Sequence, residues 1–345
     1  MQAAQPITTN ADGWDSALRE HGGHLLQSWK WGEFKSRFGW QPERIHIKTP
    51  AGEAFAQVLY RSRGPISIGY CPRGPLLVGD KAALWPELRK QIDRVSRRRR
   101  AMNVILEPDQ PIFEPGNLAG TGLKPGPEHN QPGRTVMIPL FEDDDVMLKQ
   151  MHQKTRYSVR LAMRRGVDIE VSDSRDQTAI SDFYDLLSDT SQRNEFEVHS
   201  REYYDAFLDV FGDDAFFVFA RYEGNLSAVV IAAAFGNTGT YMYGASSTEH
   251  RGHGAAFLLQ FEAMKWSRDR GCDYYDLWGI PMVDPDSVTS DDKSSIAGTK
   301  GEDWRGIFRF KTGFGGEIIN LPETAERQYI PGLPWLARKL GVIAE

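Results

Sequence analysis

The chain has 345 residues, of which 40% are hydrophobic and 26% charged, with a formal net charge of −6. This composition is typical of a globular protein and excludes a uniformly basic or collagen-like chain. One hydrophobic core rarely grows to this length, so we expect two domains of about 150–170 residues each.

The first half alternates between strand and helix patterns. Three segments are predicted as strands from their apolar and β-branched content: 53–61, 65–77 and 103–109. A helix is predicted from apolar residues at helical spacing: Leu84, Leu88, Ile92 and Val95. The acidic run EDDD (142–145) closes this half, which we assign to a first domain of residues 1–145.

The second half begins with a helix predicted from Val146 to Arg165. Strands follow at 167–171, 216–223, 226–235, 238–247 and 272–279. The apolar run AVVIAAAF (228–235) is much shorter than the ~20 residues that cross a bilayer, and we interpret it as a buried strand. The second domain is assigned to 146–320, and residues 321–345 to a tail that packs on the domains.

The two halves share one pattern. In each, a strand that carries a tyrosine, Tyr70 or Tyr243, leads through a glycine-containing turn into a helix and then into another strand. The repeat predicts an α/β (α+β) fold made of two similar domains, each with a mixed sheet flanked by helices.

The turn RGHGAA (251–256) fits the pattern R-x-x-G-x-A. Small residues at a helix start let backbone N–H groups approach a pyrophosphate, as in the acyl-CoA site of N-acetyltransferase-like (GNAT) folds. The alternative is a tight turn into a helix.

A basic stripe is predicted on the helix that contains MHQKTRYSVRLAMRRG (151–166). Arg156, Arg160 and Arg164 recur every four residues and therefore share one face. In a chain of net charge −6 this stripe favours a polyanionic partner; a solvated helix face remains the alternative.

The sequence contains no recognisable nucleophile motif. It has no G-x-S-x-G, and neither Cys71 nor Cys272 carries a catalytic signature. Because the two cysteines lie far apart and form no CxxC pair, we expect them to be thiols in a reducing compartment. The histidines show no metal-ligand spacing, so no metal and no cofactor are expected. No secretion signal is visible at the start of the sequence. We therefore expect a cytoplasmic protein whose contact with the membrane, if any, is peripheral and at its inner face.

Five segments resemble, in order, those of the FemABX family, the non-ribosomal peptidyltransferases that build peptidoglycan interpeptide bridges. They are SWKWGEFKSRFGW (28–40), YCPRGPLL (70–77), KTRYSVRLAMRRGVDIEV (154–171), YMYGASS (241–247) and GIFRFKTGFGGE (306–317). The resemblance covers roughly residues 25–320 and implies two GNAT-like domains in tandem. The long helical arm of the staphylococcal members has no counterpart in this sequence.

The resemblance implies transfer of an amino acid from aminoacyl-tRNA to an amine on the stem peptide of a lipid-linked or UDP-linked muramyl-pentapeptide. It places contacts to the precursor phosphates on Lys35, Tyr203 and Tyr243. Where the family pattern has an arginine four residues before Tyr203, this chain has His199, with Arg201 close by.

Lys311 matches the family lysine placed near the reacting ester, where an ammonium would stabilise the oxyanion of the tetrahedral intermediate. Phe310, together with Phe314, would exclude water from the substrate there. The alternative is that Lys311 is an edge lysine of a closing strand. Two candidates remain for the general base: a group of the substrate itself and a carboxylate such as Asp276.

Two other functions remain open. An acyl-CoA-dependent N-acyltransferase is supported by the R-x-x-G-x-A turn. A non-catalytic polyanion-binding protein would use the tandem fold only to present the basic stripe.

Overall fold

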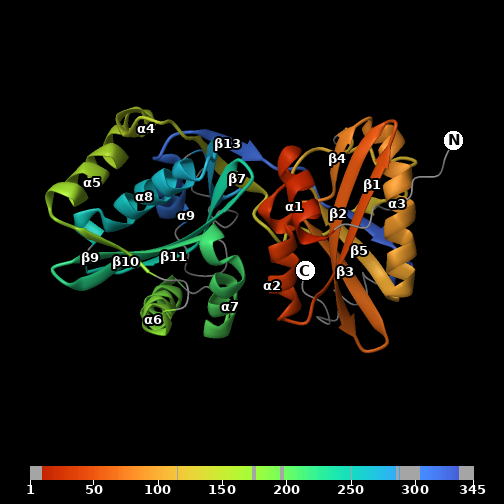
Figure 1. The fold of residues 1–345 in the computed structure, drawn as a ribbon, viewed down its shortest axis with the longest axis horizontal. Coiled ribbons are helices and arrows are strands. Elements are labelled where there is room, and N and C mark those ends of the chain that lie inside the picture. The colour runs from red at the N-terminus through yellow and green to blue at the C-terminus, as the bar shows by residue number, and fades with distance from the viewer. Residues whose placement is uncertain are drawn as a thin grey trace. The chain divides into compact units, whose positions relative to one another are not determined.

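The computed structural model describes residues 10–114, 116–172, 176–194, 198–249, 251–284, 287 and 304–333. The chain divides into two compact units, one of Met1–Gly133 with Leu321–Glu345 and one of Arg134–Asn320. The second unit begins with β7 (Arg134–Pro139), so the units divide before this strand and not after the acidic run at residue 145. Each unit is a mixed sheet with helices on its faces (Figure 1).

The first unit is built on a sheet with the strand order β1-β2-β3-β5-β14-β6, in which β4 also pairs with β2. Its strands are β1 (Gln41–Thr49), β2 (Gly52–Arg63), β3 (Ile66–Pro72), β4 (Leu76–Gly79), β5 (Ala101–Glu107), β6 (Lys124–Pro125) and β14 (Ala325–Gln328). Its helices are α1 (Ala11–Glu20), η1 (Leu25–Gln27), α2 (Trp29–Ser36) and α3 (Lys81–Arg98). Helices α1 and α2 lie on one face of the sheet and α3 covers the other (Figure 1).

The C-terminal strand β14 completes this first sheet. It pairs antiparallel with β5, and Arg327 donates two hydrogen bonds of 2.9 Å to the carboxylate of Asp93 on α3. The hydroxyl of Tyr329 donates to the same carboxylate at 2.8 Å. Residues 321–333 of the expected tail therefore belong to the first unit, and residues 334–345 lie outside the described part of the chain.

The second unit has the strand order β13-β7-β12-β11-β10-β9-β8. Besides β7, its strands are β8 (Asp168–Val171), β9 (Ala215–Tyr222), β10 (Asn225–Phe235), β11 (Thr238–Ser246), β12 (Tyr274–Gly279) and β13 (Glu317–Asn320). Its helices are α4 (Asp144–Gln150), α5 (Gln153–Arg164), α6 (Gln177–Asn194), α7 (Arg201–Phe211), η2 (Gly212–Asp214), η3 (Arg251–His253), α8 (Ala255–Asp269) and α9 (Trp304–Thr312). Helices α4, α5, α8 and α9 lie on one face of the sheet, and α6 and α7 on the other (Figure 1).

The predicted duplication is confirmed in the connectivity of the two units. In the first, β3 runs parallel to β5 and the two are joined through α3; in the second, β11 runs parallel to β12 and the two are joined through α8. In both, an antiparallel meander precedes the parallel pair: β1-β2-β3 and β9-β10-β11. Parallel strands need such a helical crossover, because a tight turn cannot bring the chain back to the start of the sheet.

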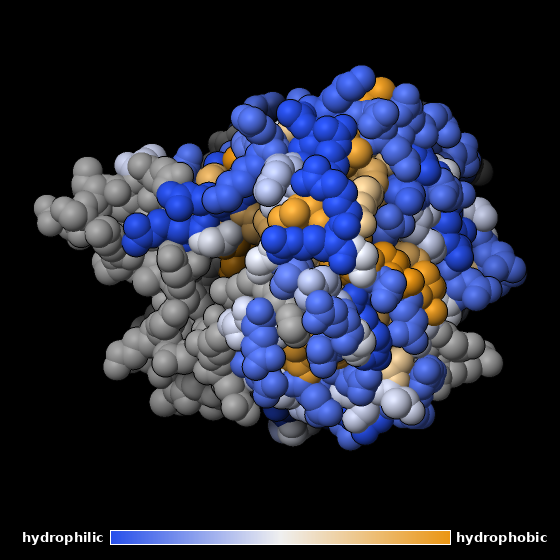
Figure 2. Space-filling model, turned by 90° about the vertical axis from the view of Figure 1, so that its left-hand side faces the viewer, coloured by the Kyte–Doolittle hydropathy of each residue, from blue (hydrophilic) through white to orange (hydrophobic). Residues whose placement is uncertain are grey.

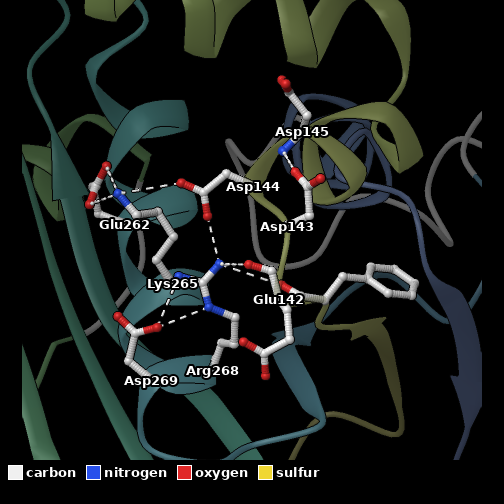
Figure 3. Close-up of polar contacts among 9 residues, drawn as sticks. Glu142, Asp143, Asp144, Asp145, Glu262, Lys265, Arg268 and Asp269 are labelled. Atoms are coloured by element: carbon white, nitrogen blue, oxygen red, sulfur yellow. Dashed lines mark hydrogen bonds and ion pairs between the residues drawn. The ribbon is translucent and has the colours of Figure 1, made fainter.

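The acidic run 142–145 fastens α4 to α8 within the second unit (Figure 3). The side chain of Asp143 caps the start of α4. Asp144 Oδ1 accepts a hydrogen bond of 2.6 Å from Arg268 Nη1, which also donates to the carbonyl of Glu142 at 3.0 Å. The run therefore serves the packing of the second unit and does not close the first.

The single helix predicted from 146 to 165 is wrong, because the structure has two helices there. The chain becomes extended at Met151, with φ −68° and ψ 149°, and α5 starts after His152. The N–H of His152 donates to the carbonyl of Gly313 at 2.9 Å. A contact with a segment far along the chain thus interrupts a locally helical pattern.

The closing segment is also different from a strand. Residues Trp304–Thr312 form α9, and β13 starts only at Glu317. Phe308 of α9 is buried in the core of the second unit, as is Phe314 directly after the helix. Lys311 is therefore a residue of the last helical turn, and the alternative of a strand-edge lysine is wrong.

Candidate active site

The parallel strands β11 and β12 stop pairing partway along their length. Their register joins Thr238–Thr240 to Tyr274–Asp276, while β11 continues to Ser246 and β12 to Gly279. Backbone groups beyond this point have no partner in the neighbouring strand, so side chains or a ligand must satisfy them.

A bulge in β11 directs two tyrosines to opposite faces of the sheet. Tyr243 pairs with Ile231 and Tyr241 pairs with the next residue, Ala232, so Met242 is the extra residue. Without a bulge, residues two apart would point to the same face. Tyr241 packs against the core under α8, and an added Cβ on Gly244 would lie 2.3 Å from its hydroxyl oxygen. Gly244 is therefore the residue that leaves room for the Tyr241 phenol.

Lys311 reaches across to both diverging strands. Its Nζ donates a hydrogen bond of 2.8 Å to the carbonyl of Gly279 at the end of β12. The same atom lies 5.4 Å from the ring centroid of Tyr241 on β11. The ammonium thus occupies the point where the two strands part, with a cation–π contact on one side.

Burial lowers the pKa of Lys311 to about 8, and the negative charge of Asp276 partly opposes this effect. At neutral pH the group remains mostly an ammonium, but one that has lost much of its hydration. Such a cation interacts strongly with a negative charge that develops beside it, because little solvent screens the contact. The site can therefore stabilise an oxyanion.

Asp276 is engaged in fixing the end of β12. Its Oδ1 accepts hydrogen bonds from the hydroxyl of Thr135 and, at 2.7 Å, from the N–H of Trp278. Trp278 has a positive φ of 62°, which is uncommon for a bulky side chain. Asp276 thus holds the strained turn that presents the carbonyl of Gly279 to Lys311.

Tyr203 and Tyr243 lie together on the opposite face of the same sheet. Their ring centroids are 6.4 Å apart, and a hydrogen bond joins their side chains. The ring centroid of Tyr204 lies 5.0 Å from that of Tyr243, and the Tyr204 hydroxyl accepts a hydrogen bond of 3.2 Å from the backbone N–H of His199. Burial raises the pKa of Tyr203 and of Tyr204 to about 12. The phenols therefore stay neutral and can donate hydrogen bonds.

His199 joins this cluster and Arg201 does not. The exposed His199 ring stacks on Tyr203 with 3.8 Å between the centroids and 25° between the planes. Arg201 instead donates a hydrogen bond of 2.9 Å to the carbonyl of Gln177 at the start of α6. Of the two residues near the expected family arginine, His199 is the one the fold sets against the tyrosines.

Lys35 belongs to the first unit, whereas Tyr203 and Tyr243 belong to the second. Its Nζ lies 5.7 Å from the ring centroid of Trp31 and 5.8 Å from that of Phe34. Burial, together with the neighbouring charge of Arg61, lowers the pKa of Lys35 to about 8.

Phe310 lies beside Lys311 in sequence but packs away from it, into the core. Its ring centroid is 4.9 Å from that of Phe257 on α8 and 5.3 Å from that of Phe314. The aromatic residues thus anchor α9 to α8 and set the position of the lysine through the helix.

The three arginines of the basic stripe have different surroundings. Arg156 Nη1 donates to the carbonyls of Lys149 and Met151 at 3.1 and 3.3 Å, and so satisfies the end of α4. Arg160 Nη2 lies 3.6 Å from an exposed carboxylate, and Arg164 lies 5.8 Å from the ring centroid of Tyr157. Only the last two present their charge on the exposed side of α5.

The glycine of the R-x-x-G-x-A turn has a packing role. Gly254 has a φ of 78°, and an added Cβ would lie 2.4 Å from the carbonyl oxygen of Ser158 on α5. A side chain here would push α5 and α8 apart. Close packing of these helices therefore explains the glycine without a pyrophosphate. The side chain of Arg251 lies outside the described residues.

Among the described residues, no group of three or more His, Cys, Asp and Glu side chains could hold a metal ion. Among the same residues, no helix is long and apolar enough to cross a bilayer.

Sequence reasoning missed two residues of the site, Tyr204 and Tyr241. Tyr204 follows a tyrosine in helix α7, and both are buried because they turn toward the same sheet. The segment YMYG (241–244) carries the signal for Tyr241, since a glycine after alternating aromatics marks a bulge or a close approach. The side to which each tyrosine points could not be deduced from it.

Comparison with known structures supports the tandem fold. The crystal structure of FemX has a TM-score of 0.80 at 20% identity, covering 96% of this chain and 99% of that one. A tandem GNAT protein from the clavulanic acid biosynthesis pathway has a TM-score of 0.52 at 12% identity, covering 94% and 98%. At these identities the likeness concerns the fold alone.

Sequence comparison gives the family. The lipid II:glycine glycyltransferase of Staphylococcus aureus is 25% identical over 215 residues, which are 58% of this chain and 50% of that protein. The chain thus spans about half the length of the curated relatives it matches. The sequence model of the FemAB family matches residues 121–228 and 223–324, more than half of the chain, and both the Lys311 site and the tyrosine cluster lie within this region. The chain therefore belongs to the FemAB family.

Proposed function

We propose that this protein is an aminoacyltransferase. It moves an amino acid from aminoacyl-tRNA to an amine on the stem peptide of a lipid-linked peptidoglycan precursor. The lipid II:glycine glycyltransferases among its relatives support the reaction class and the lipid-linked acceptor. The RNA donor rests on the family resemblance and on the basic face of α5. A lipid-linked acceptor is expected to bring the protein to the inner surface of the membrane.

The observation that carries the chemistry is the half-buried ammonium of Lys311 where β11 and β12 part. In the reaction, the acceptor amine nitrogen attacks the carbonyl carbon of the aminoacyl ester, and the carbonyl electrons move onto its oxygen. The ammonium of Lys311 stabilises this oxyanion. Collapse of the intermediate breaks the ester C–O bond; the amine gives up a proton and the 3′ oxygen of the RNA gains one. The group that first accepts the proton stays open.

The cluster of Tyr203, Tyr204 and Tyr243 supports recognition of the precursor phosphates on the other face of the sheet. Neutral phenols donate hydrogen bonds to phosphate oxygens without adding charge, and the imidazole of His199, stacked on Tyr203, adds a ring N–H donor beside them. Lys35 is assigned to the same ligand from the family resemblance alone.

A transfer assay tests the proposal. The purified chain is incubated with a lipid-linked muramyl-pentapeptide and one of two labelled donors, aminoacyl-tRNA or acetyl-CoA. Label should enter the peptide from tRNA and not from acetyl-CoA. Repeating the assay with tRNA charged by each amino acid in turn identifies the one transferred. Labelling from acetyl-CoA alone would reassign the protein as an acyl-CoA-dependent acyltransferase, and labelling from neither donor would favour a non-catalytic polyanion-binding role.

A further inference from the structure

The segment 151–166, which contains α5, combines five cations with no acidic residue: Lys154, Arg156, Arg160, Arg164 and Arg165. Two of these are used inside the fold. Arg156 caps α4, and Arg165 Nη1 donates to the carbonyl of Gly252 at 2.9 Å and contacts His253 Nδ1 at 3.1 Å. The others, Lys154, Arg160 and Arg164, are exposed to solvent.

The ion pair on this surface is weak enough to exchange. Arg160 Nη2 lies 3.6 Å from Asp145 Oδ1, and the two side chains are 49% and 70% exposed. An exposed pair of this kind contributes little, because water and salt screen it. A phosphate, which brings a charge and several acceptor oxygens, can take the place of the carboxylate.

An exposed aromatic ring lies between these cations. Tyr157 is 56% exposed, more than any other aromatic residue among the large exposed hydrophobic side chains of the described chain. It shares a helix face with Arg160 and Arg164, three and seven residues further on, and the guanidinium of Arg164 lies 5.8 Å from its ring centroid. The end of the second unit that carries α5 is otherwise mainly hydrophilic, with small apolar areas (Figure 2).

We propose that Tyr157 stacks an unpaired nucleotide of the donor RNA while Arg160 and Arg164 contact the adjoining phosphates. Exposed aromatic rings flanked by cations are the usual platform for single-stranded nucleic acid, since every base has a π face. Phosphate binding by duplex RNA would need only the arginines. This inference rests on the proposed RNA donor, whose amino acid is carried on a 3′ end that is unpaired; the surface would hold that end and not only the stem.

The experiment measures binding of two RNA hairpins to the full chain by fluorescence anisotropy at a fixed low salt concentration. One hairpin carries a four-nucleotide unpaired 3′ overhang, and the other has the same stem with a blunt end. The native protein should bind the overhang hairpin about tenfold more tightly, which corresponds to about 1.4 kcal/mol and lies within the range for one stacked base.

Three variants separate stacking from charge. Tyr157→Leu keeps an apolar side chain and a good helix former but removes the ring face, so it should abolish the tenfold preference and leave blunt-end binding unchanged. Tyr157→Phe should retain the preference. Arg164→Gln should weaken binding of both hairpins and lower the dependence on salt by about one counterion. Tyr274→Leu is the matched control, because Tyr274 is also exposed, at 43%, and lies on the strand β12 of the same unit.

Equal binding of both hairpins by the native protein, or an unchanged preference in Tyr157→Leu, would overturn the inference. The inference would also be overturned if the protein bound vesicles of anionic lipid but not RNA, and if Tyr157→Leu kept this binding. A leucine inserts into a membrane but does not stack a base. The binding assay requires no transfer. A Tyr157-dependent preference without any transfer from aminoacyl-tRNA would therefore uphold the stacking of an unpaired nucleotide and contradict the proposed function.

Discussion

Replacing Lys311 by methionine removes the ammonium and keeps an unbranched side chain of similar length. The pKa of this group falls from 10.5 to about 8 in the fold, mainly because burial strips its hydration. That difference corresponds to a net cost of about 3 kcal/mol for keeping the group charged in the fold. Lys311 is partly exposed, so this figure is an upper bound.

An oxyanion formed beside Lys311 can offset that cost in the transition state, while the neutral ester of the ground state cannot. Loss of about 3 kcal/mol is a factor on the order of 10² in rate, which agrees with the roughly 10²–10³ in kcat that removal of one oxyanion-hole donor typically costs. Lys311→Met should therefore lower kcat by a factor on the order of 10² and leave KM for the precursor nearly unchanged. Lys311→Arg should rescue poorly, because a planar guanidinium does not replace a compact ammonium.

Steady-state transfer kinetics with charged tRNA and a lipid-linked precursor measure both constants. Lys90→Met, which removes an exposed lysine of the first unit, is the control and should retain native kcat. Circular dichroism and thermal melting show whether each variant folds. Full turnover in folded Lys311→Met would refute the catalytic role, and an increase in KM with unchanged kcat would make Lys311 a binding residue instead.

Further predictions concern pH, stability and RNA. The rate of transfer should rise with pH as the acceptor amine, whose ordinary pKa is near ~10, loses its proton, and should level off above pH about 8 as Lys311 loses its own; in Lys311→Met the rise should continue. Because its folded pKa lies below its unfolded value, Lys311 should make the native protein more stable as pH rises from about 8 to 10.5, a gain that urea titrations would detect and that Lys311→Met should lack. Asp93→Asn should lower the free energy of unfolding by about 2 kcal/mol in urea titrations, since it weakens the paired hydrogen bonds from Arg327; an unchanged midpoint would contradict the role of β14. Arg156→Gln should lower the free energy of unfolding by about 1 kcal/mol with little effect on RNA affinity. Arg164→Gln should weaken RNA affinity and leave the stability nearly unchanged. Equal losses of RNA affinity in the two variants would show that Arg156 also belongs to the RNA-binding surface.

Much of the architecture follows from local sequence patterns. The apolar stripe of α3 buries one face of a helix, and the continuous apolar run 228–235 of β10 is buried on both faces of its sheet, so both are readable without tertiary knowledge. The repeat around Tyr70 and Tyr243 predicted two similar β-α-β units, and both are present. Lys311 was identified from its family motif.

Other features depend on contacts between segments distant in sequence. The helix is interrupted at Met151 because the N–H of His152 donates a hydrogen bond to the carbonyl of Gly313, and no pattern within 146–165 predicts this contact. Residues 304–312 become a helix because Phe310 packs against Phe257 of α8 and Phe308 enters the core of the second unit. Propensity is a weak prior that such packing overrides.

The sequence by itself determined the tandem α/β organisation, the lysine and the basic helix, because periodicity and residue chemistry are local properties. Only the tertiary structure decided which groups act together. The bulge at Met242 sends Tyr241 to Lys311 and Tyr243 to Tyr203, on opposite faces of one sheet. Likewise, Arg156 donates to the carbonyls at the end of α4, whereas Arg164 stays exposed beside Tyr157. The pairing of distant strands and helix ends sets these directions, because a one-residue change of register reverses every side chain that follows.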